Sequence, residues 1–152
     1  MRPLLVSACL LGALCRYDGK SKPLPADTLR ALRERYTLIP VCPEQAGGLP
    51  TPRVPSERRG DRVVNREGRD VTDAFARGAA EALRQAEQNG CALALLKERS
   101  PSCGSGAVYD GSFTGTVVPG DGVAAAALKA AGLAVYGESA VDRLLEAKDA
   151  DL

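Results

Sequence analysis

Short apolar runs recur along the chain, each followed by polar or turn-forming residues. Runs of this length are typical of strands that are buried on both faces of a parallel sheet. The pattern therefore predicts four strands, at residues 3–8, 37–42, 91–96 and 133–136. Pro40 lies in the second run, and because proline cannot donate a ladder hydrogen bond, we expect this strand near an edge or a bulge.

Between these runs, apolar positions recur at the spacing of one helix face. Four helices are predicted on this basis, at residues 25–36, 72–90, 123–131 and 139–145. A proline enters the first, Thr72 is expected to cap the second, Gly90 to end it, and Ser139 to cap the last.

Strands that alternate with helices predict a mostly parallel sheet joined by right-handed crossovers. Residues 63–71 also resemble a small hairpin. A chain of 152 residues is of the usual size for one domain. We therefore expect a single α/β domain over residues 1–152, a Rossmann-like doubly wound fold with helices on both faces.

Two long segments stand outside this alternation, at residues 43–61 and 97–122, and both are rich in glycine or proline. Long ordered loops usually carry function, because a rigid scaffold holds them in place. We therefore expect the functional residues in or beside these two loops.

Charge and composition narrow the range of partners. Twenty Lys and Arg against nineteen Asp and Glu leave a net charge of +1, and aromatic residues make up 4%. The chain has no excess of basic residues and few aromatic side chains on which bases could stack. Neither nucleic acid nor a membrane surface is therefore expected as a partner. No apolar run approaches the length of a membrane span, and a cytoplasmic location with reduced cysteines is expected.

The chain contains no histidine. This absence excludes a Ser-His-Asp triad, a Cys-His pair and every zinc site with a histidine ligand. Acid and base chemistry is left to Glu, Asp, Lys, Tyr, Ser or Cys.

Three of the five cysteines follow predicted strands. Cys9 ends the first, Cys42 ends the second, and Cys103 lies in the loop after the third. Ligands of open parallel sheets bind at the carboxyl ends of the strands, so these thiols are expected to converge. Cys91 stands at the opposite end of its strand and is expected to be a small buried hydrophobe. Cys15 is near enough to approach the pocket, although packing is the more frequent role.

Three convergent thiols do not by themselves identify the metal that they would bind. Structural zinc usually takes four ligands from close pairs such as C-x2-C, and no such pair occurs here. Thiolates also hold iron-sulfur clusters, where three cysteines leave one iron accessible as a Lewis acid. Spacing alone does not decide between a metal site and coincidence.

Four sequence blocks resemble, in order, the domain-of-unknown-function family that includes thiouracil desulfidase. They cover nearly the whole chain in the stand-alone form of the domain. The blocks are residues 7–12 (SACLLG), 15–19 (CRYDG), 42–53 (CPEQAGGLPTPR) and 97–111 (KERSPSCGSGAVYDG).

The resemblance implies a Rossmann-like domain that holds a 4Fe-4S cluster through three cysteines, with the fourth iron free. The cysteines map onto Cys9, Cys42 and Cys103, and the catalytic glutamate and serine of the family map onto Glu44 and Ser100. The implied reaction is a hydrolysis without net redox change, in which a small thiolated base such as thiouracil yields uracil and hydrogen sulfide.

Residue chemistry agrees with these roles. A partly buried carboxylate with a raised pKa is a suitable base for water, and Glu44 lies two residues after Cys42. Alternatively, Glu44 is a solvent-facing loop carboxylate or a helix-capping partner. Ser100 is suited to relay a proton or bind the substrate ring, although serines also cap turns very often.

Two other functions compete with this hypothesis. The first is a binding module in which the thiols hold zinc or carry sulfur without catalysis. The second is a nucleotide-binding Rossmann domain, which is disfavoured because Cys9-Leu10-Leu11-Gly12 follows the first strand where G-x-G-x-x-G would be required.

Overall fold

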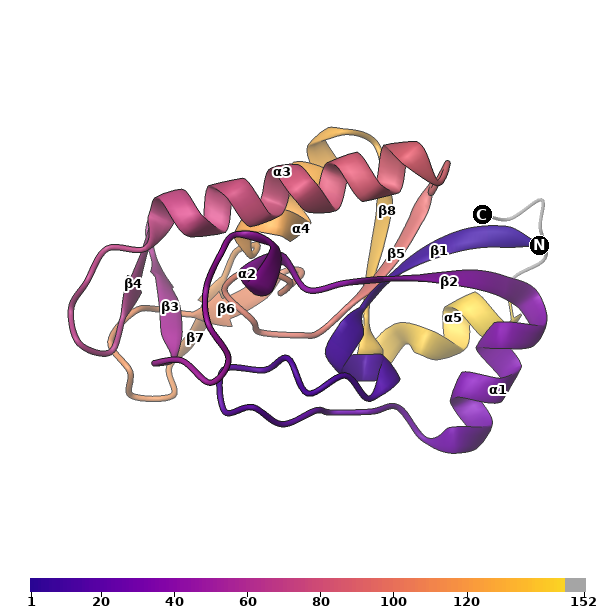
Figure 1. The fold of residues 1–152 in the computed structure, drawn as a ribbon, viewed down its shortest axis with the longest axis horizontal. Helices are drawn as coiled ribbons and strands as arrows, with labels where there is room; N and C mark the ends of the chain where they lie inside the picture. Colours follow the sequence, from indigo (N-terminus) through magenta and orange to yellow (C-terminus); the bar gives the residue numbers. More distant parts are fainter. Residues whose placement is uncertain (147–152) are drawn as a thin grey trace.

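The computed structural model describes residues 1–146, and its centre is a parallel sheet (Figure 1). The sheet contains β1 (Arg2–Ser7), β2 (Tyr36–Val41), β5 (Leu93–Leu96) and β8 (Ala134–Gly137), in the order β2-β1-β5-β8. These are the four predicted strands, shifted by one or two residues at their ends. The strand that contains Pro40 is an edge strand, as expected.

Helices pack on both faces of the sheet, which confirms the doubly wound prediction. On one face, α3 (Thr72–Gln88) and α4 (Val123–Ala130) bury a cluster that includes Ala79, Ala82 and Leu128. On the other face, α1 (Ala26–Arg35) and α5 (Val141–Glu146) bury a cluster that includes Leu32 and Leu144. The two central strands between them, β1 and β5, are buried along most of their length, which explains their continuous apolar sequence.

The chain order places a switch point in the sheet. From β1 the chain crosses through α1 to β2 on one side, and from β5 it crosses through α4 to β8 on the other. A crevice forms beyond the carboxyl ends of neighbouring strands whose connections diverge in this way. The loops after β1 and β5 therefore border a natural ligand site.

Two antiparallel hairpins lie beyond this end of the sheet (Figure 1). The first pairs β3 (Ser56–Arg59) with β4 (Arg62–Asn65), and the second pairs β6 (Ala107–Tyr109) with β7 (Val117–Pro119). The hairpin predicted at residues 63–71 is present in a short form: the Val64–Asp70 bridge is flanked by hydrogen bonds from the Asn65 N–H to the Arg69 carbonyl and from the Val71 N–H to the Val63 carbonyl, at 2.8 and 2.9 Å. The longer ladder of β4, with β3, was not predicted. The second hairpin occupies part of the expected loop 97–122.

Two predicted helix caps were wrong. The Thr72 hydroxyl accepts a hydrogen bond from the Val63 backbone N–H at 2.8 Å instead of capping α3, and Asp70 accepts from the Thr72 N–H at 2.9 Å. Ser139 lies within the 3₁₀ turn η2 (Glu138–Ala140), and α5 begins two residues later. In both places a contact from elsewhere in the fold replaced the local cap.

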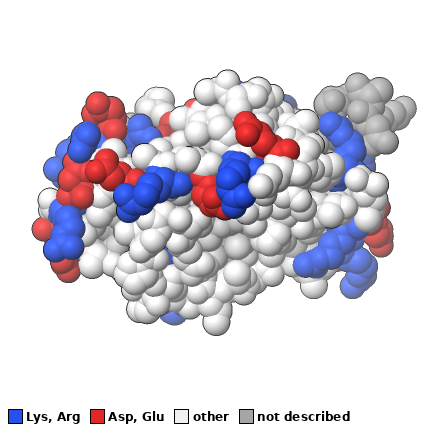
Figure 2. Space-filling model, turned by 45° about the horizontal axis from the view of Figure 1, so that its top comes forward, with Lys and Arg blue, Asp and Glu red and all other residues white. Residues whose placement is uncertain are grey.

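The surface carries charges of both signs. Figure 2 shows acidic and basic side chains in alternation across the part of this face where α3 lies. Within α3, Glu81 and Arg84 form an ion pair. No helix within residues 1–146 has the length and apolar character required to cross a membrane.

Candidate functional site

A cavity of about 830 Å³ lies beyond the carboxyl ends of β1, β2 and β5. Its volume is in the usual range for small-molecule sites. Side chains of both hairpins, among them Glu57 and Tyr109, complete its wall. All five residues predicted as functional line this cavity, namely Cys9, Cys42, Glu44, Ser100 and Cys103.

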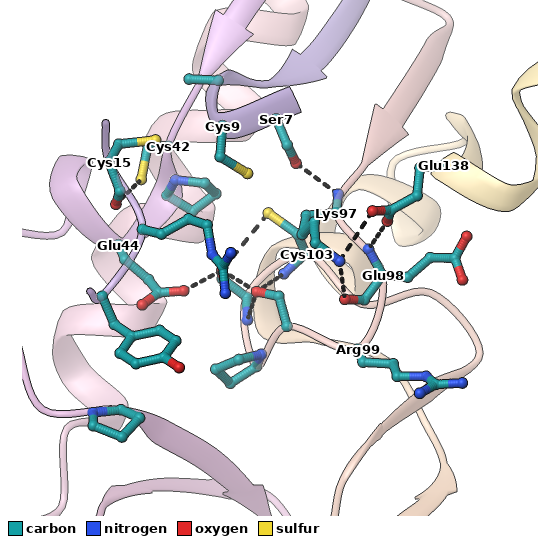
Figure 3. Close-up of a pocket in the computed structure, with 18 of the residues that line it drawn as sticks. Ser7, Cys9, Cys15, Cys42, Glu44, Lys97, Glu98, Arg99, Cys103 and Glu138 are labelled. Carbon is teal, nitrogen blue, oxygen red and sulfur yellow. Dashed lines mark hydrogen bonds and ion pairs between the residues drawn. The ribbon is translucent and has the colours of Figure 1, made fainter. Parts of the chain in front are cut away.

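Cys9 is presented by a tight turn directly after β1. The 3₁₀ turn η1 (Ala8–Leu11) follows the strand, and Gly12 ends it at φ 99°, a backbone conformation that glycine adopts without steric cost. Backbone N–H groups of Gly12 and Lys22 donate to the Cys9 carbonyl at 3.3 and 3.1 Å. Figure 3 shows the side chains of Cys9 and Cys103 pointing toward one another across the cavity.

Cys42 and Glu44 are held by the short helix α2 (Pro43–Ala46), which the sequence analysis treated as loop. Proline suits the first position of a helix, so Pro43 turns the chain sharply after β2. The backbone of α2 then lies against α3. A Cβ atom added at Gly78 of α3 would stand 1.8 Å from the Pro43 carbonyl oxygen, so this close packing requires glycine.

Cys103 is held by a compact turn after β5. The Ser100 hydroxyl oxygen accepts hydrogen bonds from the N–H groups of Ser102 and Cys103 at 3.2 and 3.1 Å. The start of α4 packs on the same turn, where the Ala124 N–H donates to the Ser102 carbonyl at 2.9 Å. These bonds fix the direction of the Cys103 side chain.

The surroundings of Cys42 and Cys103 favour the protonated forms of these two thiols in the metal-free chain. Burial raises the pKa of Cys103 to about 12, although hydrogen bonds from Ser7 and Ser102 oppose this shift. A hydrogen bond with Cys15, together with burial, raises the pKa of Cys42 well above its ordinary value. A bound metal reverses this preference, because it binds thiolates and releases the protons.

Cys15 and Cys91 occupy the places that their sequence positions indicated. The Cys42 thiol donates a hydrogen bond to the Cys15 carbonyl at 3.8 Å, and Cys15 lines the cavity (Figure 3). Cys91 is buried in the cluster beneath α3 and α4 and is absent from the cavity wall. Its role is that of a packing residue.

Glu44 belongs to a buried polar network. Arg53 Nε donates to Glu44 Oε1 at 3.1 Å, and the Ser102 hydroxyl donates to Oε2 at 2.9 Å. The side chains are 7% exposed for Arg53 and 15% for Glu44, so the alternative of a solvent-facing carboxylate is wrong. The Ser100 and Ser102 hydroxyl oxygens are 2.9 Å apart, which extends the network along the cavity wall.

A second cluster of charges borders the cavity near the end of β5. Lys97 Nζ pairs with Glu138 Oε2 at 3.0 Å, and the Lys97 N–H donates to the Ser7 hydroxyl at 2.9 Å (Figure 3). Hydrogen bonding by the Ser139 side chain and by its backbone N–H lowers the pKa of the Glu98 carboxyl. These contacts join the segment after β5 to the turn after β8.

The sequence analysis did not identify Ser7, Ser102 and Arg53 as parts of the site. Ser7 stands at the end of β1 and Ser102 directly before Cys103, so proximity to a strand end or a ligand cysteine was an available signal. Arg53 ends the sequence block at residues 42–53, but the sequence alone does not place it beside Glu44, because that contact depends on the path of the loop between α2 and β3.

The donor set of the cavity fits an iron-sulfur cluster. Cys9, Cys42 and Cys103 offer soft sulfur ligands around a common space, which suits iron and sulfide better than hard cations. Within the described part of the chain, no three His, Cys, Asp or Glu side chains are grouped as ligands of one metal ion.

Fold and site together define a Rossmann-like α/β protein with a thiol-rich ligand cavity at the switch point of its sheet. Residues 4–140 match the model of the 2-thiouracil desulfurase family, and the chain belongs to this family. The resemblance noted in the four sequence blocks is thereby confirmed.

Two relatives extend this comparison over nearly the whole chain. A solved structure named as the 4Fe-4S-dependent thiouracil desulfidase TudS is 47% identical, with a TM-score of 0.90 and coverage of 95% of each chain. The Bacillus subtilis (strain 168) protein YbbK, described as uncharacterized, is 39% identical over 93% of this chain and 99% of its own length.

Proposed function

We propose that this protein is a 4Fe-4S-dependent desulfidase that removes sulfur from a thiolated nucleobase such as thiouracil by hydrolysis. The observation that carries the proposal is the meeting of Cys9, Cys42 and Cys103 with a buried Glu44–Ser102–Ser100 network in one cavity. The 47% identity to a 4Fe-4S-dependent thiouracil desulfidase supports the same chemistry.

Cys9, Cys42 and Cys103 are the proposed ligands of the cluster. Each follows a different strand end, and three ligands leave one of the four irons without a cysteine. When bound, the cluster supplies a Lewis acid that prefers the soft sulfur of a thiocarbonyl and draws electrons from its carbon.

The chain's own residues handle the protons. Glu44 is the proposed base that takes a proton from the attacking water, and Arg53 and Ser102 hold its carboxylate at the cavity wall. Ser100 is proposed to relay a proton or to bind the substrate ring. Its hydroxyl oxygen is fixed by two backbone N–H groups.

Iron and acid-labile sulfide after anaerobic reconstitution test the cluster. The wild-type protein should hold about four irons and four sulfides per chain, with broad visible absorption. Cys9→Ala, Cys42→Ala and Cys103→Ala should each lose most of this iron, whereas Cys91→Ala is the matched control that should retain it. Full iron in the three ligand variants would refute the ligand assignment.

Sulfide release from thiouracil tests the activity. Glu44→Gln should retain the cluster and lose roughly 100-fold to 10,000-fold in rate, because the base is gone while the ligands remain. Zinc at about one per chain, with no labile sulfide and no turnover, would instead establish the non-catalytic zinc-binding or sulfur-carrier module.

Location and domain organisation are part of the proposal. Five cysteines without a disulfide suit a reducing cytoplasm. The two hydrophobic clusters lie on opposite faces of one sheet, which supports a single domain over residues 1–152. Residues 147–152 lie outside the described part of the chain.

A further inference from the structure

Ser102 is a buried residue with a side chain that links the two proposed catalytic groups. It is 1% exposed, one of two polar residues in the described chain that are buried to this degree, the other being Ser7. Its hydroxyl donates to Glu44 Oε2 at 2.9 Å and lies 2.9 Å from the hydroxyl oxygen of Ser100. Both neighbours line the cavity from different segments of the chain.

The number of hydroxyl hydrogens decides which group donates and which accepts in each of these hydrogen bonds. A serine hydroxyl carries one hydrogen. The Ser102 hydroxyl has two acceptors within reach, the Glu44 carboxylate at 2.9 Å and the Cys103 sulfur at 3.6 Å. The carboxylate oxygen is the stronger acceptor, because it is closer and charged. Because the Ser102 hydroxyl donates its hydrogen to Glu44, Ser100 must be the donor in the hydrogen bond between the two serine hydroxyls.

Ser100 is fully engaged in this arrangement. Its oxygen accepts the N–H groups of Ser102 and Cys103, and its hydrogen is directed to the Ser102 oxygen. Two donors on one hydroxyl oxygen make its hydrogen a better donor, because hydrogen bonds in a chain polarise one another. The line of donors runs from the backbone through Ser100 and Ser102 to Glu44.

We propose that Ser102 is a positioning residue for the desulfidase reaction, coupling the hydroxyl of Ser100 to the carboxylate of Glu44. This inference rests on the proposed function. It adds to that function a physical connection between base and hydroxyl that neither residue provides alone, since within the described chain the Ser102 hydroxyl stands between them.

The coupling holds the base ready for the proton of the attacking water. Oε2 of Glu44 accepts the Ser102 hydroxyl and Oε1 accepts Arg53 Nε, so the carboxylate is fixed at the cavity wall while it takes this proton. The Ser100 hydroxyl strengthens the Ser102 donor, and neither serine has to lose its hydrogen.

Substitution of Ser102 gives the first part of the test. Ser102→Ala should lower kcat for sulfide release by at least about tenfold with KM unchanged, because the hydroxyl acts on the base and not on substrate binding. Ser102→Thr, which restores a hydroxyl on the same carbon, should recover most of kcat. Ser105→Ala, in the same loop but outside the cavity wall, is the matched control and should behave as the wild type.

A double-mutant cycle with Glu44→Gln gives the decisive part. If Ser102 acts through Glu44, adding Ser102→Ala to Glu44→Gln should cost less than about threefold, far less than in the wild-type background. Equal factors in both backgrounds would overturn the proposal. Iron content and thermal unfolding of each variant show whether the fold and the cluster are intact.

The outcomes separate this inference from the function on which it rests. Absence of sulfide release by the iron-loaded wild-type protein contradicts the proposed function. Release by the wild type together with an unaltered kcat in Ser102→Ala contradicts the coupling alone. A Ser102→Ala protein that loses iron and activity in proportion would show a structural role and would also overturn the coupling.

Discussion

At the scale of single residues, Arg53 balances the charge of the site. Its guanidinium donates to Glu44 Oε1, to the Cys15 and Pro50 carbonyls and to the Thr51 hydroxyl, at distances from 2.9 to 3.1 Å. A buried ion pair is costly to break from one side, because the remaining charge loses both its partner and its hydration. Arg53 thus supports Glu44 and the loop that carries Cys15.

Substitution of Arg53 should therefore be more destabilising than substitution of its partner. Arg53→Met is expected to lower the free energy of unfolding by about 3 kcal/mol or more, since Glu44 is left buried and unpaired. Glu44→Gln should cost less, because Arg53 keeps its three other acceptors. Urea unfolding of both variants measures the difference, and equal losses would contradict this account.

At the scale of elements, the contact of α2 with α3 sets the position of Cys42 and Glu44. Cβ atoms added at Gly47 and Gly78 would come within 2.0 and 1.8 Å of the backbone oxygens of Ala74 and Pro43. These glycines allow the two backbones to approach more closely than any side chain permits. The start of α2, where the proposed ligand and base stand, is thereby fixed to the longest helix.

Gly78→Ala separates helix propensity from packing. Alanine is favoured over glycine in a helix by about 1 kcal/mol, yet here the added methyl group must displace α2 at a cost of about 1–3 kcal/mol. We expect lower stability and lower iron loading in Gly78→Ala. Ala76→Gly, at an exposed position of α3, is the control. It should lose stability because glycine has a lower helix propensity than alanine, but it should bind as much iron as the wild-type protein. A more stable Gly78→Ala protein would rule out the close contact.

The carboxyl group of Asp70, just before α3, makes the stability of the fold depend on pH in the acid range. Hydrogen bonds from the side chain and backbone of Thr72, together with Arg62, lower the pKa of Asp70 from 3.8 to about 2. A lowered pKa in the folded state contributes stability that is complete above the unfolded pKa, near 4, and is lost as the pH falls toward 2. Thermal unfolding of Asp70→Asn should therefore vary less between pH 4 and 2 than that of the wild type.

Asp61→Asn, in the neighbouring turn between β3 and β4, is the matched control for this measurement. It should retain the acid sensitivity of the wild-type protein. Identical pH profiles for Asp70→Asn and the wild type would show that Asp70 does not stabilise the folded state in this range.

At the scale of the whole molecule, the proposed cluster joins three segments that are distant in sequence. Cys9 follows β1, Cys42 follows β2, and Cys103 precedes α4. A ligand that binds only the folded chain stabilises it in proportion to its binding free energy. The cavity end of the sheet should thus depend on the cluster more than the buried strands do.

Removal of iron by a chelator under anaerobic conditions should lower the melting temperature by about 5 °C or more. Cys91→Ala should show the same difference between its loaded and metal-free forms, whereas Cys9→Ala should show none. Equal melting temperatures of the loaded and metal-free wild-type protein would contradict a cluster held by all three segments.

Sequence periodicity predicted the elements that form the core and missed those that border the cavity. The central strands β1 and β5 are continuous apolar runs because they are buried along most of their length. The edge strands β2 and β8 are partly exposed but are still short apolar runs. β3 has the sequence Ser-Glu-Arg-Arg and carries no apolar signal. β7 has the apolar sequence Val-Val-Pro, but it is only three residues long and exposed. The Thr72 and Ser139 caps failed because contacts with Val63 and Glu98 outcompeted the local bonds.

The amino-acid sequence by itself determined which faces are buried, and so the parallel sheet, the helices on its two sides and the strand ends where Cys9, Cys42 and Cys103 stand. Local pattern suffices for these features because burial follows residue type and spacing. Only the tertiary structure decided that Arg53, Ser102 and Ser7 join the site. Their contacts cross between loops, and the packing of segments as far apart as α2 and the turn after β5 sets those distances.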